Sequence, residues 1–576
     1  MTRTVEAWFA EADAAEENGD LLRACDVLEQ AVGEHPSEVG LRRRAVLVLV
    51  RAGAARHARR RFLDFALDGE DDAATAALSA RIDRALALAE TGDERRRLAA
   101  RAAERYDALY VSTTDPADLA TAGTLLLVAG QLPASAERAR AALVAATGSA
   151  LTTAVVRAHA FLLLADAEAA RDAVRRLADL IDDITHRAEL LGELEIVCIE
   201  RGLPTSMLDP LRGATVASYT GHRLGSRLRE ADLTDVAAQI RAAVAAERPE
   251  VAFGSLADGA DILWAEALLA AGTELHVVLP LGATRFVDAM VAPSWRARFA
   301  TCLAAATSVD HVTEDAVALD ATLLSHTTSL CLGRALLRAR FLHADAVQLA
   351  VWDGQPSTRP GGTAADVAAW AATGRRVVRI TPPTRSGSDE VSSVPARRQV
   401  RAIMFADVRG FSQLDDEGAV AFGEHVIGAF DAVLDGWGDA ILEANTWGDG
   451  LHVVVADVAT AAQVALQLQE SFSALNLAAC GLPDSLALRL GAHAGPVVEV
   501  VDGVRERRGF FGSHVSRTAR IEPVTPPGTV YVTEAFAALL ELHDQDALTC
   551  EYVGYVPAAK GYGALRMHRL LRTGCQ

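Results

Sequence analysis

Two aspartates in the last third of the chain have the type and spacing to hold divalent cations. Asp407 directly follows the apolar run Gln399–Ala406. Asp449 stands in a Gly-Asp-Gly turn between the apolar runs Ala440–Trp447 and Leu451–Ala456, which predicts a hairpin with Asp449 at its tip. Carboxylates at neighbouring strand ends can converge on Mg²⁺, which binds one or two carboxylates together with phosphate oxygens. Two such ions can activate an attacking oxygen and neutralise a triphosphate leaving group.

The motifs around these aspartates resemble a known family. FADVRGFS and NTWGDGLHVVV, in this order and with helical sequence between them, resemble the catalytic domain of class III nucleotidyl cyclases, the adenylate and guanylate cyclases. The downstream stretches LRLGAHAGPVVE, GFFGSHVSRTARIEPVTPPGTVYVTEAF and KGYGALRMHRLL resemble the same family, so the resemblance runs from Arg398 to Arg572. It implies an α+β, ferredoxin-like domain over residues 399–576. It also implies a lyase that converts a nucleoside triphosphate to a 3′,5′-cyclic nucleotide and pyrophosphate for intracellular signalling.

The resemblance assigns roles around the two aspartates. It implies that Asp407 and Asp449 bind two Mg²⁺ or Mn²⁺ ions per active site, with Val408 beside them. It also implies that the backbone through Gly410 and Phe411 lies against the phosphates of the substrate.

Two cations complete the implied site. Arg520 matches the arginine that stabilises charge during cyclisation, a role that suits an always-charged guanidinium. Lys560 matches the lysine that holds the terminal phosphates. In this family the aspartates of one protomer face the arginine and lysine of another, so the resemblance implies a head-to-tail homodimer with two active sites.

Three positions depart from the family pattern. Asn445 stands where adenylate cyclases carry Lys and guanylate cyclases carry Glu, and the second base-reading position falls at Gly509. An amide can pair with a purine or a pyrimidine edge, so these residues do not determine which base is cyclised. ATP is the favoured substrate. Ser516 replaces the usual ribose-positioning Asn and can either bind the ribose or simply pack. The alternative is a catalytically degenerate, cyclase-like nucleotide-binding regulator or scaffold.

Residues 204–380 alternate short apolar runs with helical stretches. The predicted strands are Ala214–Tyr219, Val251–Ser255, Glu274–Leu279, Ser308–Val312, Ala346–Trp352 and Val377–Ile380. This alternation predicts a Rossmann-like α/β domain, a parallel sheet with helices on both faces. Ligands of such sheets bind beyond the carboxyl ends of the strands.

Glycines and polar residues follow several of these strands. The candidate ligand site consists of Gly221, His222, Arg223, Ser255, Gly259, Asp353, Gly361 and Gly362. Glycines there let backbone N–H groups approach an anion, although each can also serve only to make a tight turn. The segments YTGHR, SLADGAD and WDGQP…GGT resemble SLOG-type Rossmann-like domains, which implies a small-molecule or nucleotide-like ligand. Nucleotide or glycosidic-bond cleavage by this domain is a further open alternative.

Residues 1–203 are helical in pattern. NGDLLRACDVLEQAVGEHPSEVGLRRRAVLVLVRAG resembles a tetratricopeptide-type helix pair, which implies a protein partner, while an irregular helical bundle stays open. Residues 381–398, rich in Pro, Ser and charge, predict a linker.

Composition limits the remaining possibilities. The 576 residues include 56 Lys and Arg against 76 Asp and Glu, a formal net charge of -20, which argues against a nucleic-acid or anionic-membrane binder. The first residues carry no apolar signal segment, and no stretch is apolar enough to span a membrane. The 7 cysteines include no C-x-x-C. We therefore expect a soluble, reduced, cytoplasmic protein.

Overall fold

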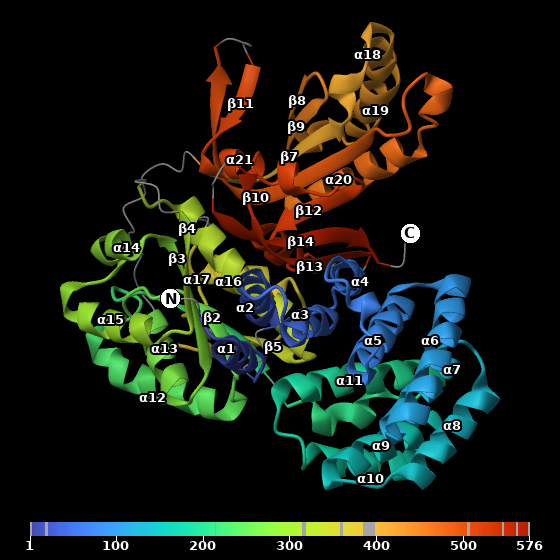
Figure 1. Cartoon of the computed structure of the whole chain (residues 1–576). Helices are drawn as coiled ribbons and strands as arrows, with labels where there is room; N and C mark the ends of the chain where they lie inside the picture. The colour runs from blue at the N-terminus through green and yellow to red at the C-terminus, as the bar shows by residue number, and fades with distance from the viewer. Residues whose placement is uncertain are drawn as a thin grey trace.

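The computed structural model describes residues 3–17, 21–213, 215–313, 318–356, 361–383, 398–503, 507–543, 547–559 and 563–573. Figure 1 shows a helical N-terminal part in blue and teal, a middle part in green and yellow, and a C-terminal part in orange and red. In the described part of the chain, every helix is too short or too polar to cross a lipid bilayer.

The N-terminal part consists of helices, most of which pack on the next helix along the chain. They are α1 (Val5–Glu17), α2 (Leu21–Glu34), α3 (Val39–Arg51), α4 (Ala55–Asp64), α5 (Ala73–Ala89), α6 (Gly92–Thr113), α7 (Pro116–Val128), α8 (Leu132–Ala145), α9 (Ala150–Leu163), α10 (Ala167–Ala178) and α11 (Ile184–Arg201). Asp72, Asp115 and Asp166 cap α5, α7 and α10 by accepting backbone N–H groups that the helix leaves unpaired. Helix α11 contacts α1, α7 and α9. The predicted helical region is confirmed, and the tetratricopeptide label stays a prediction.

The middle part is a parallel sheet, as predicted. Its strands are β1 (Thr215–Gly221), β2 (Val251–Gly254), β3 (Glu274–Leu281), β4 (Ser308–Thr313), β5 (Asp345–Val351) and β6 (Val377–Ile380), in the order β4-β3-β2-β1-β5-β6. Its helices are α12 (Leu233–Glu247), α13 (Ala260–Ala270), α14 (Ala283–Met290), α15 (Arg296–Ala305), α16 (Ala321–Leu342) and α17 (Thr363–Ala371). Neighbouring residues of β1 enter different cores, Val216 with α16 and Ala217 with α12 and α13, so helices cover both faces. The Rossmann label stays a prediction.

The C-terminal part is an α+β domain. Its elements are β7 (Arg398–Arg409), α18 (Asp416–Phe422), α19 (Gly428–Asp435), β8 (Ile441–Trp447), β9 (Gly450–Val455), α20 (Val458–Ala474), β10 (Ala487–Asp502), β11 (Arg507–Phe511), α21 (Ser513–Thr518), β12 (Thr529–Thr533), α22 (Glu534–Leu540), β13 (Leu548–Pro557) and β14 (Ala564–Arg572). Strands β10, β7, β9 and β8 lie in this order with antiparallel neighbours, the arrangement of a ferredoxin-like βαββαβ unit. Strand β12 adds to β10 in parallel, and β13 and β14 extend that edge.

Most strand boundaries lie within two residues of the predicted ones, and two differences concern residues of the site or the linker. Strand β7 continues past Ala406 to Arg409 because β10 pairs with it as far as Ala487, so Asp407 lies within the strand instead of after it. Arg398, predicted to end the linker, begins β7, and its guanidinium pairs with Asp320 at 2.6 Å. Residues 384–397 of the predicted linker lie outside the described residues.

Helix α16 joins the middle and C-terminal parts through one hydrophobic core. It packs against the middle sheet and against α22, β7 and β10, and the core that contains it includes Val251 from the middle part and Met404 from β7. A Cβ on Gly333 would lie 1.9 Å from the backbone oxygen of Ala538, so the backbones of α16 and α22 touch at this point. The two parts are therefore packed as closely as elements within one domain.

Candidate active site

The two predicted metal aspartates meet at one end of the C-terminal sheet. Asp407 lies in β7, and Asp449 lies in the turn between β8 and β9, as predicted. Strands β7 and β9 pair through Ala406 and Leu451, which brings the turn beside Asp407. Burial raises the pKa of Asp449, and the charge of Asp407 and a side-chain hydrogen bond with it raise that pKa further. Two carboxylates this close repel each other unless a cation lies between them.

An arginine and a third carboxylate that the sequence analysis missed lie beside this pair. Arg489 faces Asp407 across the β7–β10 pairing and donates a hydrogen bond to its carboxylate. The same guanidinium lies 2.9 Å from Glu522, in the turn after α21. Burial raises the pKa of Glu522 to about 7, although the positive charge of Arg489 acts in the opposite direction and lowers it. Arg489 was detectable as a charged residue within an otherwise apolar strand, whereas no local pattern marks Glu522.

The segment after Asp407 has the geometry of a tight loop. Gly410 has φ +96°, a conformation that glycine adopts without strain, and a Cβ there would lie 3.1 Å from Leu486. The Phe411 ring packs on Phe422 at 4.7 Å and approaches Gly448 in the β8–β9 turn. The side chain of Val408 is fully buried, so only its backbone is available to a ligand.

Asn445 contacts the strand that contains Gly509. The Asn445 amide oxygen accepts a hydrogen bond from Arg507 of β11, and its nitrogen donates to Glu443 at 3.3 Å. Glu443 in turn accepts the backbone N–H of Phe510 at 3.0 Å. The structure thus brings the two predicted base-reading positions to adjoining strands, with Glu443 as a link that the sequence analysis missed.

Helix α21 and the turn after it hold the remaining predicted residues. Ser516 is exposed on α21, and Arg520 is half-buried just beyond its end. The Arg520 oxygen accepts the N–H of Ala559 at 3.1 Å, and Lys560 itself lies outside the described residues. Among the described residues, no ion pair joins Arg520 to Asp407 or Asp449, the predicted metal ligands. Within one chain, Arg520 is therefore not paired with Asp407 or Asp449.

In the middle part, the strand order reverses between β1 and β5, and predicted ligand residues meet there. His222 Nε2 lies 3.2 Å from Asp353, and Asp353 lies 3.7 Å from Arg227, which the sequence analysis missed. Arg223 instead pairs with Asp258 at 3.0 Å. A Cβ on Gly259 would lie 2.8 Å from the backbone oxygen of His222, so this glycine permits a close approach of two loops.

The other predicted positions of this part have mainly structural surroundings. A Cβ on Gly221 would lie 2.3 Å from the Cβ of Ala260, and both Gly361 and Gly362 have positive φ before α17. Ser255 follows β2 and is half-buried.

Comparison with known proteins identifies the C-terminal part. The family model of the adenylate and guanylate cyclase catalytic domain matches residues 394–571. The chain therefore carries a class III adenylate/guanylate cyclase catalytic domain, and no curated protein matches the chain.

Solved cyclase structures are also similar to part of the chain. The guanylate cyclase domain of RhGC from Catenaria anguillulae in complex with GTP has 19% identity and a TM-score of 0.27, covering 31% of this chain and 100% of that one. The adenylyl cyclase CyaB from P. aeruginosa has 17% identity and a TM-score of 0.27, covering 30% and 95%. An adenylate cyclase structure from Trypanosoma brucei in its monomeric state has 19% identity and a TM-score of 0.26, covering 32% and 94%.

Proposed function

We propose that this protein is a nucleotidyl cyclase that converts a nucleoside triphosphate, with ATP favoured, to a 3′,5′-cyclic nucleotide and pyrophosphate. The observation that carries the proposal is the approach of Asp407 and Asp449 within a cyclase catalytic domain. The ribose 3′-hydroxyl attacks the α-phosphorus, and pyrophosphate leaves. Arg520 stabilises the charge that develops, Lys560 holds the terminal phosphates, and Ser516 contacts the ribose.

The residues present fit Mg²⁺ or Mn²⁺. The charge of Asp407 raises the pKa of the adjacent Asp449, so this pair of carboxylates gains from a divalent cation, and oxygen ligands are those that Mg²⁺ prefers. Asp407, Asp449 and the backbone of Val408 would hold the ions. When bound, two ions lower the pKa of the attacking hydroxyl and neutralise the triphosphate. Arg489 keeps the Asp407 carboxylate oriented through its hydrogen bond.

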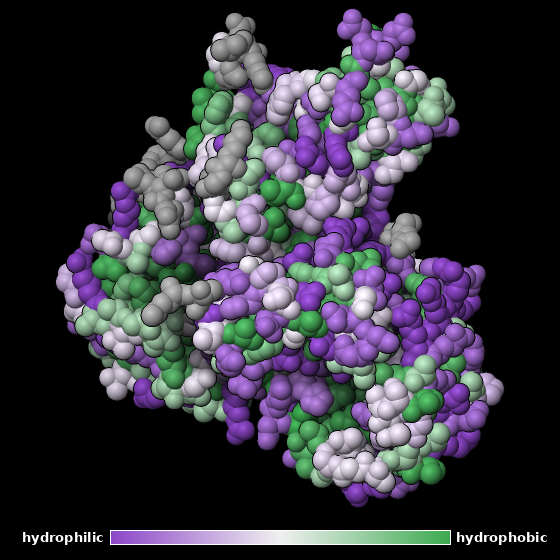
Figure 2. Space-filling model, viewed as in Figure 1, coloured by the Kyte–Doolittle hydropathy of each residue, from purple (hydrophilic) through white to green (hydrophobic). Residues whose placement is uncertain are grey.

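A second copy of the chain completes the proposed active site. Apolar side chains are exposed on the hairpin β10–β11, where Val501 is 73% and Phe511 51% exposed. Figure 2 shows apolar residues on this hairpin, at the upper left of the view. Exposed apolar side chains on a projecting hairpin favour contact with another protein surface. In a head-to-tail homodimer, Arg520 of one copy faces Asp407 and Asp449 of the other.

We further infer that the middle part binds a small nucleotide-like ligand where β1 and β5 end. Ligands of parallel sheets bind where the strand order reverses, and His222, Arg227 and Asp353 gather at that place. Thermal-shift measurements with mononucleotides test this inference. A ligand that stabilises the protein but not its Arg227→Gln variant supports it, and no stabilisation by any mononucleotide contradicts it.

The proposed activity is tested by incubating the full chain with Mn²⁺ or Mg²⁺ and with ATP, GTP, CTP and UTP separately, and identifying products by mass spectrometry. Asp407→Asn keeps the side-chain shape but removes its charge. We expect one cyclic nucleotide, with the rate lowered by at least about 10²-fold in this variant. Undiminished activity of the variant would contradict the assignment. Nucleotide binding by calorimetry without product from any of the four would favour the non-catalytic regulator.

A further inference from the structure

A cavity of about 650 Å³ lies where the three parts of the chain meet. Its walls come from α1 and α2 of the N-terminal part, from β4 and α16 of the middle part, and from α21, α22 and β14 of the C-terminal part. Its volume lies within the range of small-molecule sites. The cavity is separate from the carboxyl ends of β1 and β5, and none of the predicted active-site residues that the structure describes lines it.

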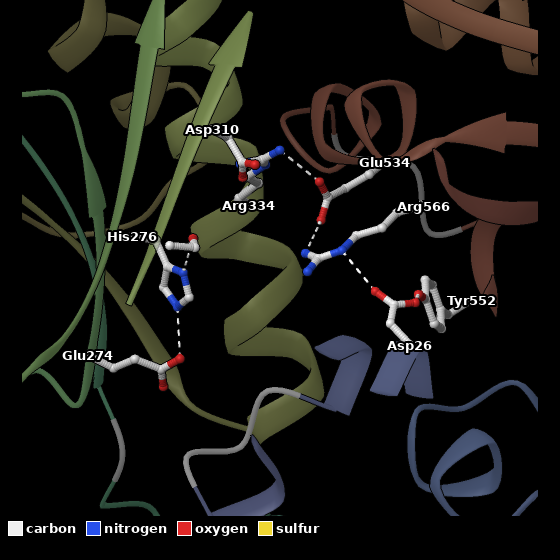
Figure 3. A network of polar contacts seen from close by, with 9 residues as sticks. Asp26, Glu274, His276, Asp310, Arg334, Glu534, Tyr552 and Arg566 are labelled. Carbon is white, nitrogen blue, oxygen red and sulfur yellow. Dashed lines mark hydrogen bonds and ion pairs between the residues drawn. The ribbon is translucent and has the colours of Figure 1, made fainter. Parts of the chain in front are cut away.

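A chain of ion pairs crosses this junction (Figure 3). Arg334 of α16 pairs with Asp310 of β4 at 2.6 Å and with Glu534 of α22 at 2.7 Å. Arg566 of β14 pairs with Glu534 at 3.3 Å and with Asp26 of α2 at 3.2 Å. These alternating charges hold the walls of the cavity in place, because moving one part separates partly buried charges.

Each carboxylate that the described residues contribute to the cavity walls has an arginine partner. Asp26, Asp310 and Glu534 are paired as described, and Glu11 pairs with Arg3 and, at 3.6 Å, with Arg23. Among the residues that the structure describes, the walls contain five arginines, which are Arg3, Arg23, Arg334, Arg517 and Arg566, against four carboxylates, which are Glu11, Asp26, Asp310 and Glu534. The described part of the lining therefore has one more positive than negative side chain.

Arg517 of α21 supplies this excess. Among the described residues, no carboxylate lies within ion-pair distance of its guanidinium. The groups near it are the imidazoles of His326, His493 and His514, whose pKa values are lowered by burial and by the positive charge of Arg517. Neutral imidazoles do not balance a guanidinium, and a half-buried charge without a counterion is unfavourable.

We propose that this cavity binds a small phosphate-bearing anion and that Arg517 is its principal ligand. Guanidinium groups donate paired hydrogen bonds that match phosphate oxygens. Arg3 and Arg23 lie on the N-terminal wall of the same cavity, and Arg3 stacks over the Trp8 ring at 4.3 Å. The cavity volume accommodates an anion larger than inorganic phosphate, up to the size of a nucleotide.

Binding at Arg517 also reaches the proposed catalytic residues. Arg517 is adjacent to Ser516, and its backbone oxygen accepts the N–H of Arg520 at 3.0 Å. An anion that draws Arg517 into the cavity therefore biases the position of the turn that carries Arg520. This regulatory consequence rests on the proposed cyclase function, whereas the binding itself does not.

The test is calorimetric titration of the full chain with pyrophosphate in the presence of EDTA, which removes the divalent ions that pyrophosphate would need at the active site. We expect binding that weakens about tenfold or more in Arg517→Gln and in Arg23→Gln. Arg520→Gln, three residues away but outside the cavity, and Arg176→Gln, on the exposed face of α10, should bind as the unchanged protein does.

The outcomes separate the cavity from the active site. No binding to the unchanged protein, or equal binding by Arg517→Gln, would overturn the proposal. Loss of binding in Arg520→Gln with retention in Arg517→Gln would place the anion at the active site and overturn it as well. Because Arg23 lies in a different part of the chain, its variant carries the test if Arg517→Gln does not fold. None of these outcomes depends on cyclase activity.

Discussion

The carboxylate of Asp26 in α2 accepts a hydrogen bond from the phenol of Tyr552 in β13, 526 residues further along the chain. The Tyr552 ring is fully buried and belongs to the hydrophobic core of the N-terminal helices. Nearby, Glu551 accepts the backbone N–H of Arg56 at 3.2 Å. The helical part is therefore packed directly on β13, a strand at the edge of the C-terminal sheet.

Loss of the Asp26–Tyr552 hydrogen bond should destabilise the whole chain. Tyr552→Phe removes the donor and leaves a buried carboxylate with one partner fewer, which costs about 1–3 kcal/mol. Chemical unfolding of the full chain measures this change. The matched control is Tyr219→Phe, because the buried Tyr219 hydroxyl has no hydrogen-bond partner among the described residues. Equal destabilisation by both changes would show that the Asp26 contact contributes nothing.

Helix α16 should tolerate no side chain at Gly333. A Cβ there meets the backbone oxygen of Ala538, which cannot rotate away, so Gly333→Ala forces α16 and α22 apart and costs about 1–3 kcal/mol. The control is Gly428→Ala in α19, where a Cβ meets nothing within 4 Å and the change should stabilise by up to about 1 kcal/mol. Thermal unfolding of both variants tests this prediction, which fails if Gly333→Ala is as stable as the control.

Acid should weaken the contact between the middle and C-terminal parts. Burial and the charge of Arg517 lower the pKa of His326 in α16 to about 4, so the unfolded chain binds a proton there before the folded chain does. The stability contributed by the neutral imidazole is complete above about pH 6.5 and is lost as the pH falls toward about 4.

The size of this effect can be measured. Between about pH 7.5 and pH 5, His326 should account for about 2 kcal/mol of the decrease in unfolding free energy. His326→Phe should remove that share of the decrease, while the same replacement at exposed His425 should not. Identical pH dependence in the His326 variant and the unchanged protein would contradict the prediction.

The local pattern of apolar and turn residues was sufficient to predict the strands of the middle part and the hairpin that carries Asp449. The predicted strands of the middle part match β1 to β6 within a few residues, because a parallel sheet buried on both faces requires continuous apolar runs. The pairing of Asp407 with Arg489 was not predictable, since it depends on the register between β7 and β10. The Asp26–Tyr552 contact and the close packing at Gly333 join segments hundreds of residues apart, for which the sequence carries no local signal.

Asn445 should govern which base the site accepts. Its amide now bonds to Arg507 and Glu443, and a charged side chain there changes the hydrogen-bonding groups offered to the base. Asn445→Glu should raise kcat/KM for GTP relative to ATP by about tenfold or more, and Asn445→Lys should shift the ratio the other way. The control is a replacement of Trp447, which is 52% exposed beside the same turn and should leave the ratio of kcat/KM for GTP and ATP unchanged. An unchanged ratio in both Asn445 variants would remove this residue from base recognition.

The most direct test of a cyclase site shared between two chains is to mix two inactive variants. Asp407→Ala and Arg520→Ala each remove one half of the site, so each alone should make almost no cyclic nucleotide. In an equal mixture, half of the dimers contain both variants and have one intact site, which predicts about a quarter of the unchanged activity. Recovery of activity on mixing would support catalysis between two chains. A mixture as inactive as its components, with the unchanged chain active, would contradict the shared site.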